Sequence, residues 1–205
     1  MVEVLEQRIV VGISGASGSV IAQRLIEVLQ SKVRRVYVVA TETATSVARL
    51  ELGGKKESLL LEILETSQWR CPMNVVRKFA IDNLFAPFAS GSSVASQMVV
   101  APCSMGTLAR ICHGVSTNLL ERAADVVLKQ NLPLVLCPRE SPFNVIHLKN
   151  MLELAQLGVK IVPAIPGFYQ RPETIDDLID YIVGRLLEVM GIPHDLYARW
   201  NAKLI

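Results

Sequence analysis

The sequence predicts an α/β protein with a doubly wound parallel sheet and helices on both faces of that sheet. Apolar runs of strand length alternate along the chain with longer segments that have helical periodicity. A length of 205 residues suits one domain with a sizeable core. Ligands of such sheets bind beyond the carboxyl ends of the strands, so the residues that follow each strand are the first candidates for a functional site.

The individual elements follow from these two periodicities. We expect strands at 8–14, 34–40, 97–102, 133–137 and 159–163. We expect helices at 18–31, 43–51, 57–67, 105–112, 117–130, 143–157 and 174–190. Between about 70 and 96, a short strand candidate at 75–80 is mixed with a loop rich in Pro, Gly and Ser. A C-terminal tail begins at about residue 191.

Composition limits the classes of partner. Hydrophobic residues make up 51% of the chain and charged residues 20%, which leaves little polar surface for a monomer and predicts large contacts between subunits. The net charge is +2, and the 21 Lys and Arg are scattered among 19 Asp and Glu. The sequence therefore predicts no nucleic-acid interface.

The cysteines and the apolar segments indicate a compartment. Four cysteines accompany only three histidines and lack CxxC spacing, so neither a metal site nor a disulfide framework is predicted. No signal peptide is recognisable, and no apolar run reaches about 18 residues. We therefore expect a cytoplasmic protein without a membrane span.

The first strand ends in a turn of glycines and small hydroxyl residues, Gly15-Ala16-Ser17-Gly18-Ser19. Such a turn lets backbone N–H groups approach a phosphate at a helix N-terminus. It has neither the Lys-Ser/Thr ending of a Walker loop nor the GxGxxG spacing of a dinucleotide site, and a tight turn without any ligand remains the alternative.

The second strand ends at Thr41 and Glu42. An acid at this point holds a ribose in dinucleotide enzymes, so Glu42 keeps a nicotinamide oxidoreductase open, whereas Thr41 suits a mononucleotide equally well. From its sequence position alone, Glu51 at the end of the next helix is expected to be a solvated charge.

A second hydroxyl-and-glycine turn, Ser104 to Thr107, follows the strand at 97–102. Two such turns on neighbouring strands would flank one anion. Cys103, just before this turn, has no histidine in a recognisable partner position, so a small buried cysteine is expected rather than a nucleophile.

Four charged side chains in the second half of the chain are further candidates for a ligand site. Arg122 and Lys129 are seven residues apart, hence on one helix face, where they form either a phosphate grip or a solvated face supported by an Asp125–Lys129 pair. Arg139 and Glu140 follow the strand at 133–137, a position that favours a ligand site over a surface ion pair.

Two further candidates lie near the C-terminus. Tyr169 follows a Pro-Gly turn beyond the last strand, and Arg185 lies at the margin of the apolar stripe of the last helix. The DDxxD run that begins at Asp176 resembles a magnesium–diphosphate motif, but Thr174 and Asp177 have N-cap and N3 spacing. We therefore interpret this run as a helix start.

Several strings taken together resemble the UbiX-type flavin prenyltransferases, older members of which were labelled aromatic acid decarboxylases. The strings are GASG (15–18), SGSS (90–93), APCSMGTLA (101–109), NLLERAADVVLK (118–129), PRESPFNVIHLKNM (138–151) and PGFY (166–169). The resemblance covers essentially the whole chain, and its most specific part is the block from 118 to 151.

This resemblance implies a flavodoxin-like (Rossmann-like) fold, with residues 1–205 forming a single FMN-binding flavoprotein domain. It implies a homododecamer whose active site is shared between subunits. It also implies that dimethylallyl monophosphate donates a prenyl group to N5 and C6 of reduced FMN without a metal ion. The implied product is prenylated FMN for a partner UbiD-type decarboxylase in ubiquinone synthesis or aromatic acid breakdown.

The resemblance also assigns residues to roles. The implied FMN contacts are Gly15, Ala16, Ser17, Thr41, Ser104, Met105, Gly106, Thr107 and Arg139. The implied cradle for the prenyl phosphate consists of Ser90, Gly91, Ser92, Arg122, Lys129, Tyr169 and Arg185. The implied catalytic residues are Glu140, Glu51 and Ser17, and Trp200 resembles a tail aromatic near the site. Thr41 and Met105 stand where the family frequently has serine and threonine.

The chemistry explains these residue types. Cleavage of an allylic C–O bond releases a phosphate, and cations and a phenol stabilise its negative charge. Glu140 is our first choice for proton transfer. Three alternatives remain open. They are an FMN-dependent decarboxylase of an aromatic or cysteinyl acid, a non-catalytic flavin carrier, and the nicotinamide oxidoreductase that uses Glu42.

Overall fold

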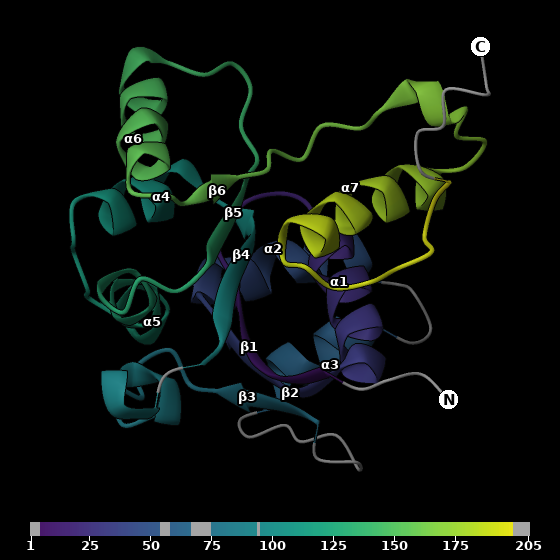
Figure 1. The fold of residues 1–205 in the computed structure, drawn as a ribbon. Helices are drawn as coiled ribbons and strands as arrows, with labels where there is room; N and C mark the ends of the chain where they lie inside the picture. Colours follow the sequence, from purple (N-terminus) through teal and green to yellow (C-terminus); the bar gives the residue numbers. More distant parts are fainter. Residues whose placement is uncertain (1–4, 54–57, 67–74, 94, 199–205) are drawn as a thin grey trace.

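A computed structural model describes residues 5–53, 58–66, 75–93 and 95–198 of the chain and confirms the α/β fold (Figure 1). The strands are β1 (Leu5–Ile13), β2 (Val33–Ala40), β3 (Val76–Phe79), β4 (Gln97–Cys103), β5 (Leu134–Pro138) and β6 (Lys160–Ile161). The α-helices are α1 (Ser19–Lys32), α2 (Glu42–Leu52), α3 (Leu59–Glu65), α4 (Met105–Cys112), α5 (Leu119–Lys129), α6 (Val145–Gln156) and α7 (Ile175–Val189). Short 3-10 turns are η1 (Pro87–Ala89), η2 (Gly91–Ser93) and η3 (Phe168–Gln170).

The six strands form one parallel sheet in the order β3-β2-β1-β4-β5-β6. The chain runs outward from β1 to β3 at one edge, returns to the centre at β4 and continues outward to β6. The five strands from β2 to β6 have the flavodoxin order, and the four-residue strand β3 extends the edge next to β2. The direction reverses between β1 and β4, which makes this point the expected ligand crevice.

Helices cover both faces of the sheet. One apolar cluster packs α1, α2, α3 and α7 against one face, and a second packs α4, α5 and α6 against the other (Figure 1). Every residue of β4 and β5 is buried, as expected for the central strands of a parallel sheet covered on both sides.

The predicted helices and strands are all present, including the short strand β3, and the differences lie at their ends. Helix α1 begins after Gly18, whose φ of 119° is outside the helical range. Helix α6 begins only at Val145, because Asn144 forms a capping box with His147. The three 3-10 turns were not predicted, since short i to i+3 turns have no distinctive periodicity.

The segment after α7 packs back onto that helix. A β-carbon at Gly184 would lie 2.3 Å from the Tyr197 ring and 2.7 Å from His194, so a glycine lets the two segments approach closely. Within the described residues, no helix combines the length and the apolar character needed to cross a lipid bilayer.

Candidate active site at the switch point

Ser14 ties together the ends of the two strands at the switch point. The Ser14 side chain is buried, its Oγ donates to the carbonyl of Pro102 at 3.2 Å, and it accepts from the Ser104 N–H at 2.7 Å. The N–H of Thr41 donates to the carbonyl of Ile13 at 3.0 Å. The turns that follow β1, β2 and β4 therefore meet at one edge of the sheet.

The turn after β4 opens helix α4. Ser104 is the N-cap, and its Oγ accepts from the Thr107 N–H at 3.4 Å and lies 3.1 Å from the Thr107 hydroxyl. Thr107 and Met105 are buried, whereas Gly106 is exposed. The prediction of a hydroxyl-and-glycine turn at a helix N-terminus is confirmed.

The turn after β1 packs tightly against the start of α2. A β-carbon on Gly15 would lie 2.5 Å from Cγ2 of Thr43, so only glycine fits at this position without a shift. Ala16 is buried and Ser17 is half-buried, while Thr41 caps α2 by accepting from the Ala44 N–H at 3.1 Å.

Glu51 is a partner of the first turn and not a solvated charge. Its carboxylate accepts from the N–H groups of Gly18, at 3.0 and 3.1 Å, and of Ser19, at 2.7 Å. Burial alone would raise the pKa of Glu51, but hydrogen bonds from the Ser17 hydroxyl and from Ser19 and Gly18 outweigh it and hold the pKa below its usual value. The expectation of a solvated Glu51 is wrong because α2 returns the side chain to the N-terminus of α1.

This contact also changes the interpretation of the first turn. The N–H groups of Gly18 and Ser19 already donate to a carboxylate, so in this arrangement they are not free for a phosphate. Glu51 acts as the cap that Gly18 cannot supply from its own side chain. The N-terminus of α4 is the better phosphate candidate of the two turns.

We expect Glu51→Ala to lower the free energy of unfolding by about 1–2 kcal/mol, as loss of an N-cap does. In the wild type, Glu51 contributes fully to the free energy of unfolding above about pH 4.3, the ordinary pKa of a glutamate. This contribution is lost as the pH falls through the lowered pKa of Glu51 in the folded state. Urea unfolding of both proteins at pH 7 and at pH 3.5 measures this. Equal stabilities at pH 7 would contradict the capping role.

Arg139 and Glu140 do not pair with each other. The N–H of Arg139 donates to the carbonyl of Cys103 at 3.2 Å, which places the backbone of this segment next to the turn that opens α4. A Glu140 carboxylate oxygen accepts from the Ser141 N–H at 3.0 Å. Both side chains are exposed, and the Arg139 guanidinium has no partner among the described residues. The interpretation of Arg139 and Glu140 as a surface ion pair is therefore wrong. A cation and a carboxylate are available for a ligand at this edge of the sheet.

The predicted phosphate residues fall into two separate groups within one chain. In the first group, Arg122 donates to the carbonyl of Ala89 at 3.1 Å and pairs with Asp125 at 3.0 Å. This carbonyl precedes the turn formed by Ser90, Gly91 and Ser92, in which the two serine hydroxyls lie 3.2 Å apart. The expected Asp125–Lys129 pair is not formed among the described residues, and Lys129 is exposed.

The second group surrounds a pocket of about 520 Å³ between η3, the end of α7 and the segment after it. Tyr169 and Arg185 line it together with Glu188 and Tyr197. Arg185 pairs with Glu188, and the neighbouring Tyr197 hydroxyl and Glu188 carboxylate raise the pKa of its guanidinium. The Tyr169 hydroxyl lies 3.1 Å from that of Tyr181.

The two groups lie on different sides of the subunit, with α5 and η1 at one side of the sheet and η3 at the far end of α7 (Figure 1). Sequence reasoning missed Glu188, Tyr181 and Tyr197. Tyr181 and Glu188 lie within one turn of Arg185 on α7, a signal that helical spacing offered. Trp200 lies outside the described residues.

Two other interpretations are confirmed. Thr174 and Asp177 form a capping box at the start of α7, so Asp177 of the DDxxD run serves the helix. Cys103 is fully buried, and burial raises the pKa of its thiol well above the ordinary value, so it is not an activated nucleophile.

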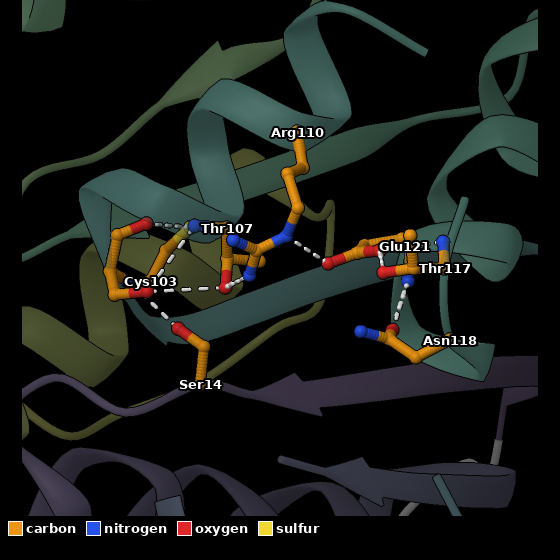
Figure 2. A network of polar contacts seen from close by, with 8 residues as sticks. Ser14, Cys103, Thr107, Arg110, Thr117, Asn118 and Glu121 are labelled. Carbon is orange, nitrogen blue, oxygen red and sulfur yellow. Dashed lines mark hydrogen bonds and ion pairs between the residues drawn. The ribbon is translucent and has the colours of Figure 1, made fainter. Parts of the chain in front are cut away.

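A polar network around the buried carboxylate of Glu121 extends from the α4 turn to α5 (Figure 2). Arg110 donates to Thr107 at 3.3 Å and pairs with the carboxylate of Glu121, whose side chain is 0% exposed. That carboxylate also accepts from the N–H of Thr117, at 2.8 Å, and from its hydroxyl, at 2.6 Å. Asn118 caps α5 by accepting from the Glu121 N–H at 3.0 Å. The network joins the candidate phosphate turn to the start of α5.

The doubly wound fold and the hydroxyls, carboxylates and guanidinium at this edge of the sheet define a class of protein. The Flavoprotein family model matches residues 2–187, so the chain is a member of the Flavoprotein family. Flavin prenyltransferase UbiX from Halalkalibacterium halodurans is 47% identical over 191 residues, which cover 93% of this chain and 92% of that protein. The chain belongs to the family of UbiX flavin prenyltransferases, as its sequence motifs indicated.

Solved structures agree with this assignment. The crystal structure of AnUbiX (PadA1) in complex with FMN and dimethylallyl pyrophosphate has a TM-score of 0.84 and 34% identity, covering 96% of this chain and 98% of that one. The dodecameric FMN-dependent UbiX-like decarboxylase from Escherichia coli O157:H7 also has a TM-score of 0.84, with 35% identity, covering 95% and 100% of the two chains.

Proposed function

We propose that this protein transfers the dimethylallyl group of dimethylallyl monophosphate to N5 and C6 of reduced FMN without a metal ion. The observation that carries the proposal is the arrangement at the carboxyl edge of the sheet. Glu51 binds the turn that contains Ser17, and the segment of Arg139 and Glu140 lies next to the turn that opens α4. The family membership and the FMN and dimethylallyl pyrophosphate held by AnUbiX support it.

The donor set at this edge fits FMN. A flavin phosphate needs backbone N–H groups at a helix N-terminus. The first turn of α4 offers the N–H groups of Met105 and Gly106, with the hydroxyls of Ser104 and Thr107 beside them. The Arg139 guanidinium, which has no partner in the described part of the chain, adds a positive charge near this turn. Gly15, Ala16, Ser17, Thr41 and Met105 line the turns around this point and are the proposed remaining contacts.

Reduced FMN, when bound, supplies the nucleophilic N5 and C6 positions. The protein's share is to stabilise the departing phosphate and to move protons. Arg122, Lys129 and Arg185 supply positive charge and Tyr169 a phenol, aimed at charge that grows as the C–O bond breaks. A monophosphate carries less negative charge than a diphosphate, so these side chains replace a magnesium ion in the proposal.

Two carboxylates divide the proton transfers in this proposal. Glu51 accepts from the Gly18 and Ser19 N–H groups next to Ser17, and its lowered pKa keeps the carboxylate ionised as an acceptor for a proton that passes through the Ser17 hydroxyl. Glu140 is exposed next to Arg139 and takes the proton lost from C6. Arg139 then binds FMN while Glu140 transfers protons, so the adjacent charges serve two partners.

The predicted phosphate-binding residues form two separate groups in one chain, and this separation supports a site assembled from more than one subunit. Helix α5, which carries Arg122, and helix α7, which carries Arg185, cover opposite faces of the sheet, so in the proposal neighbouring copies bring the two groups together (Figure 1). We propose a homododecamer, the state of the Escherichia coli relative. Trp200 is proposed to approach the site from the tail.

We propose that a UbiD-type decarboxylase uses the product, prenylated FMN, in ubiquinone synthesis or aromatic acid breakdown. We place the protein in the cytoplasm. The three cysteines that the structure describes, Cys103, Cys112 and Cys137, are free, which suits a reducing compartment.

We expect Arg185→Ala to raise the KM for dimethylallyl monophosphate about tenfold or more, because a charge-assisted hydrogen bond to the phosphate is lost. Phosphate release under anaerobic conditions with saturating reduced FMN measures this, and Arg171→Ala, an exposed arginine that lines a different pocket, is the control. An unchanged KM would favour a flavin-dependent decarboxylase that has no prenyl phosphate to hold.

A further inference from the structure

We propose that Cys112, His113 and Glu153 form a zinc site that joins the end of α4 to α6. A thiol sulfur, an imidazole nitrogen and a carboxylate oxygen from these residues all lie within 4.8 Å of one another. They form the one such group of three among the described residues. Zinc accepts this set of ligands, with water completing a tetrahedron. The proposal concerns a place at the far end of α4 from Ser104 and is independent of the prenyl-transfer chemistry.

The distances are close to those of a bound ion. Zinc–ligand bonds of about 2.0–2.3 Å place tetrahedral ligand atoms about 3.3–3.6 Å apart. The Cys112 sulfur already lies 3.3 Å from a carboxylate oxygen of Glu153, so this pair has the required spacing. His113 and Glu153 are exposed, and neither ring nitrogen of His113 has a partner among the described residues. The other separations are at most 4.8 Å, about 1 Å longer than the tetrahedral spacing, so rotation about the side-chain bonds has only this gap to close.

The local electrostatics favour a cation here. Cys112 is the last residue of α4 and His113 is its C-cap, so the carbonyl end of the helix dipole points at the site. The nearest arginine on α4, Arg110, is held by Glu121 and Thr107. Lys149 lies one turn before Glu153 on α6 and is the one basic residue of that helix besides His147. Metal binding replaces the thiol proton of Cys112, which leaves to solvent.

The position gives the ion a structural role. Helices α4 and α6 pack against each other on one face of the sheet. Helix α4 begins at the Ser104 turn, and α6 follows the segment that carries Arg139 and Glu140. An ion at their far ends therefore links the two elements that present the candidate flavin contacts, while α4 itself, about 12 Å long, separates it from those contacts.

Cobalt(II) titration of the full-length protein tests the site, because thiolate coordination gives a charge-transfer absorption in the near ultraviolet. We expect this band to saturate at one cobalt per chain and to be displaced by zinc. Cys112→Ser should abolish it, and His113→Ala and Glu153→Gln should weaken the cobalt Kd by more than about tenfold, the loss that even outer-shell changes produce. The control variant His147→Gln should titrate like the wild type.

Thermal unfolding supplies a second readout. Zinc should raise the Tm of the wild type and leave that of Cys112→Ser unchanged, since an ion that binds only the folded state stabilises it. The proposal is overturned if the wild-type protein gives no thiolate band. A band that persists in Cys112→Ser, or a cobalt Kd unchanged in both His113→Ala and Glu153→Gln, overturns it as well.

Discussion

Replacing Arg110 by methionine is expected to destabilise the protein by about 3 kcal/mol. The change leaves the carboxylate of Glu121, which is 0% exposed, without its charge partner. We expect a value at the low end for such losses, because Arg110 itself is 42% exposed and water can partly replace it. Urea unfolding of Arg110→Met and wild type at pH 7 measures the difference.

The surface pair between Arg49 and Glu65 provides the matched control. Its side chains are 60% and 48% exposed, so Arg49→Met should cost less than about 1 kcal/mol. A loss in Arg110→Met no larger than that in Arg49→Met would show that the buried network contributes nothing beyond an exposed ion pair.

The same network predicts a dependence on pH. Burial alone would raise the pKa of Glu121, but hydrogen bonds from Thr117 and Arg110 outweigh it and hold the pKa below its usual value. A lowered folded-state pKa contributes stability above about pH 4.3 that is lost as the pH falls further. The difference between wild type and Arg110→Met should therefore shrink in acid.

Glu140→Gln is expected to lower kcat for prenyl transfer by about 100-fold or more, the usual contribution of a positioned acid–base group. The amide keeps the size of the side chain and its hydrogen bond from the Ser141 N–H but cannot take a proton. The Kd for FMN should stay within about twofold of the wild type, because the proposal assigns flavin binding to Arg139. Flavin fluorescence gives the Kd, and single-turnover anaerobic kinetics give the rate.

An exposed acid on a different segment, changed by Glu173→Gln, is the control and should behave as the wild type in both assays. A Glu140→Gln protein that binds FMN and turns over normally removes Glu140 from the proton transfer and leaves Glu51 as the remaining candidate.

The strand ends were predictable from sequence because they depend on local patterns. Apolar runs separated by helical segments located β1, β4 and β5. The residues after these strands, such as Ser104 and Arg139, lie at one edge of the sheet as expected. Parallel topology alone brings those positions together, so no long-range contact had to be known.

Long-range polar contacts were not predictable. Glu51 caps a helix that starts more than thirty residues earlier, and no periodicity connects the two places. Glu121 reads as one charged residue among several on a helix, and only packing shows that its side chain is buried against Arg110. Cys112 and Glu153 belong to separate helices, so cysteine spacing gave no sign that these two side chains lie close together.

The grouping of the phosphate residues needed the structure as well. Arg122 and Arg185 carry the same implied role, yet α5 and α7 lie on opposite faces of the sheet (Figure 1). Sequence resemblance assigns residues to a role without saying which subunit supplies each one. The two groups therefore belong to a shared site only as part of the proposed assembly.

Mass spectrometry of the flavin tests the central claim most directly. The protein is incubated anaerobically with reduced FMN and dimethylallyl monophosphate, without added metal, and the flavin is then extracted. Our account predicts a flavin heavier by one five-carbon prenyl unit, with phosphate released in equal amount. FMN that binds the protein but is recovered unmodified would contradict the transferase and favour a decarboxylase or a flavin carrier.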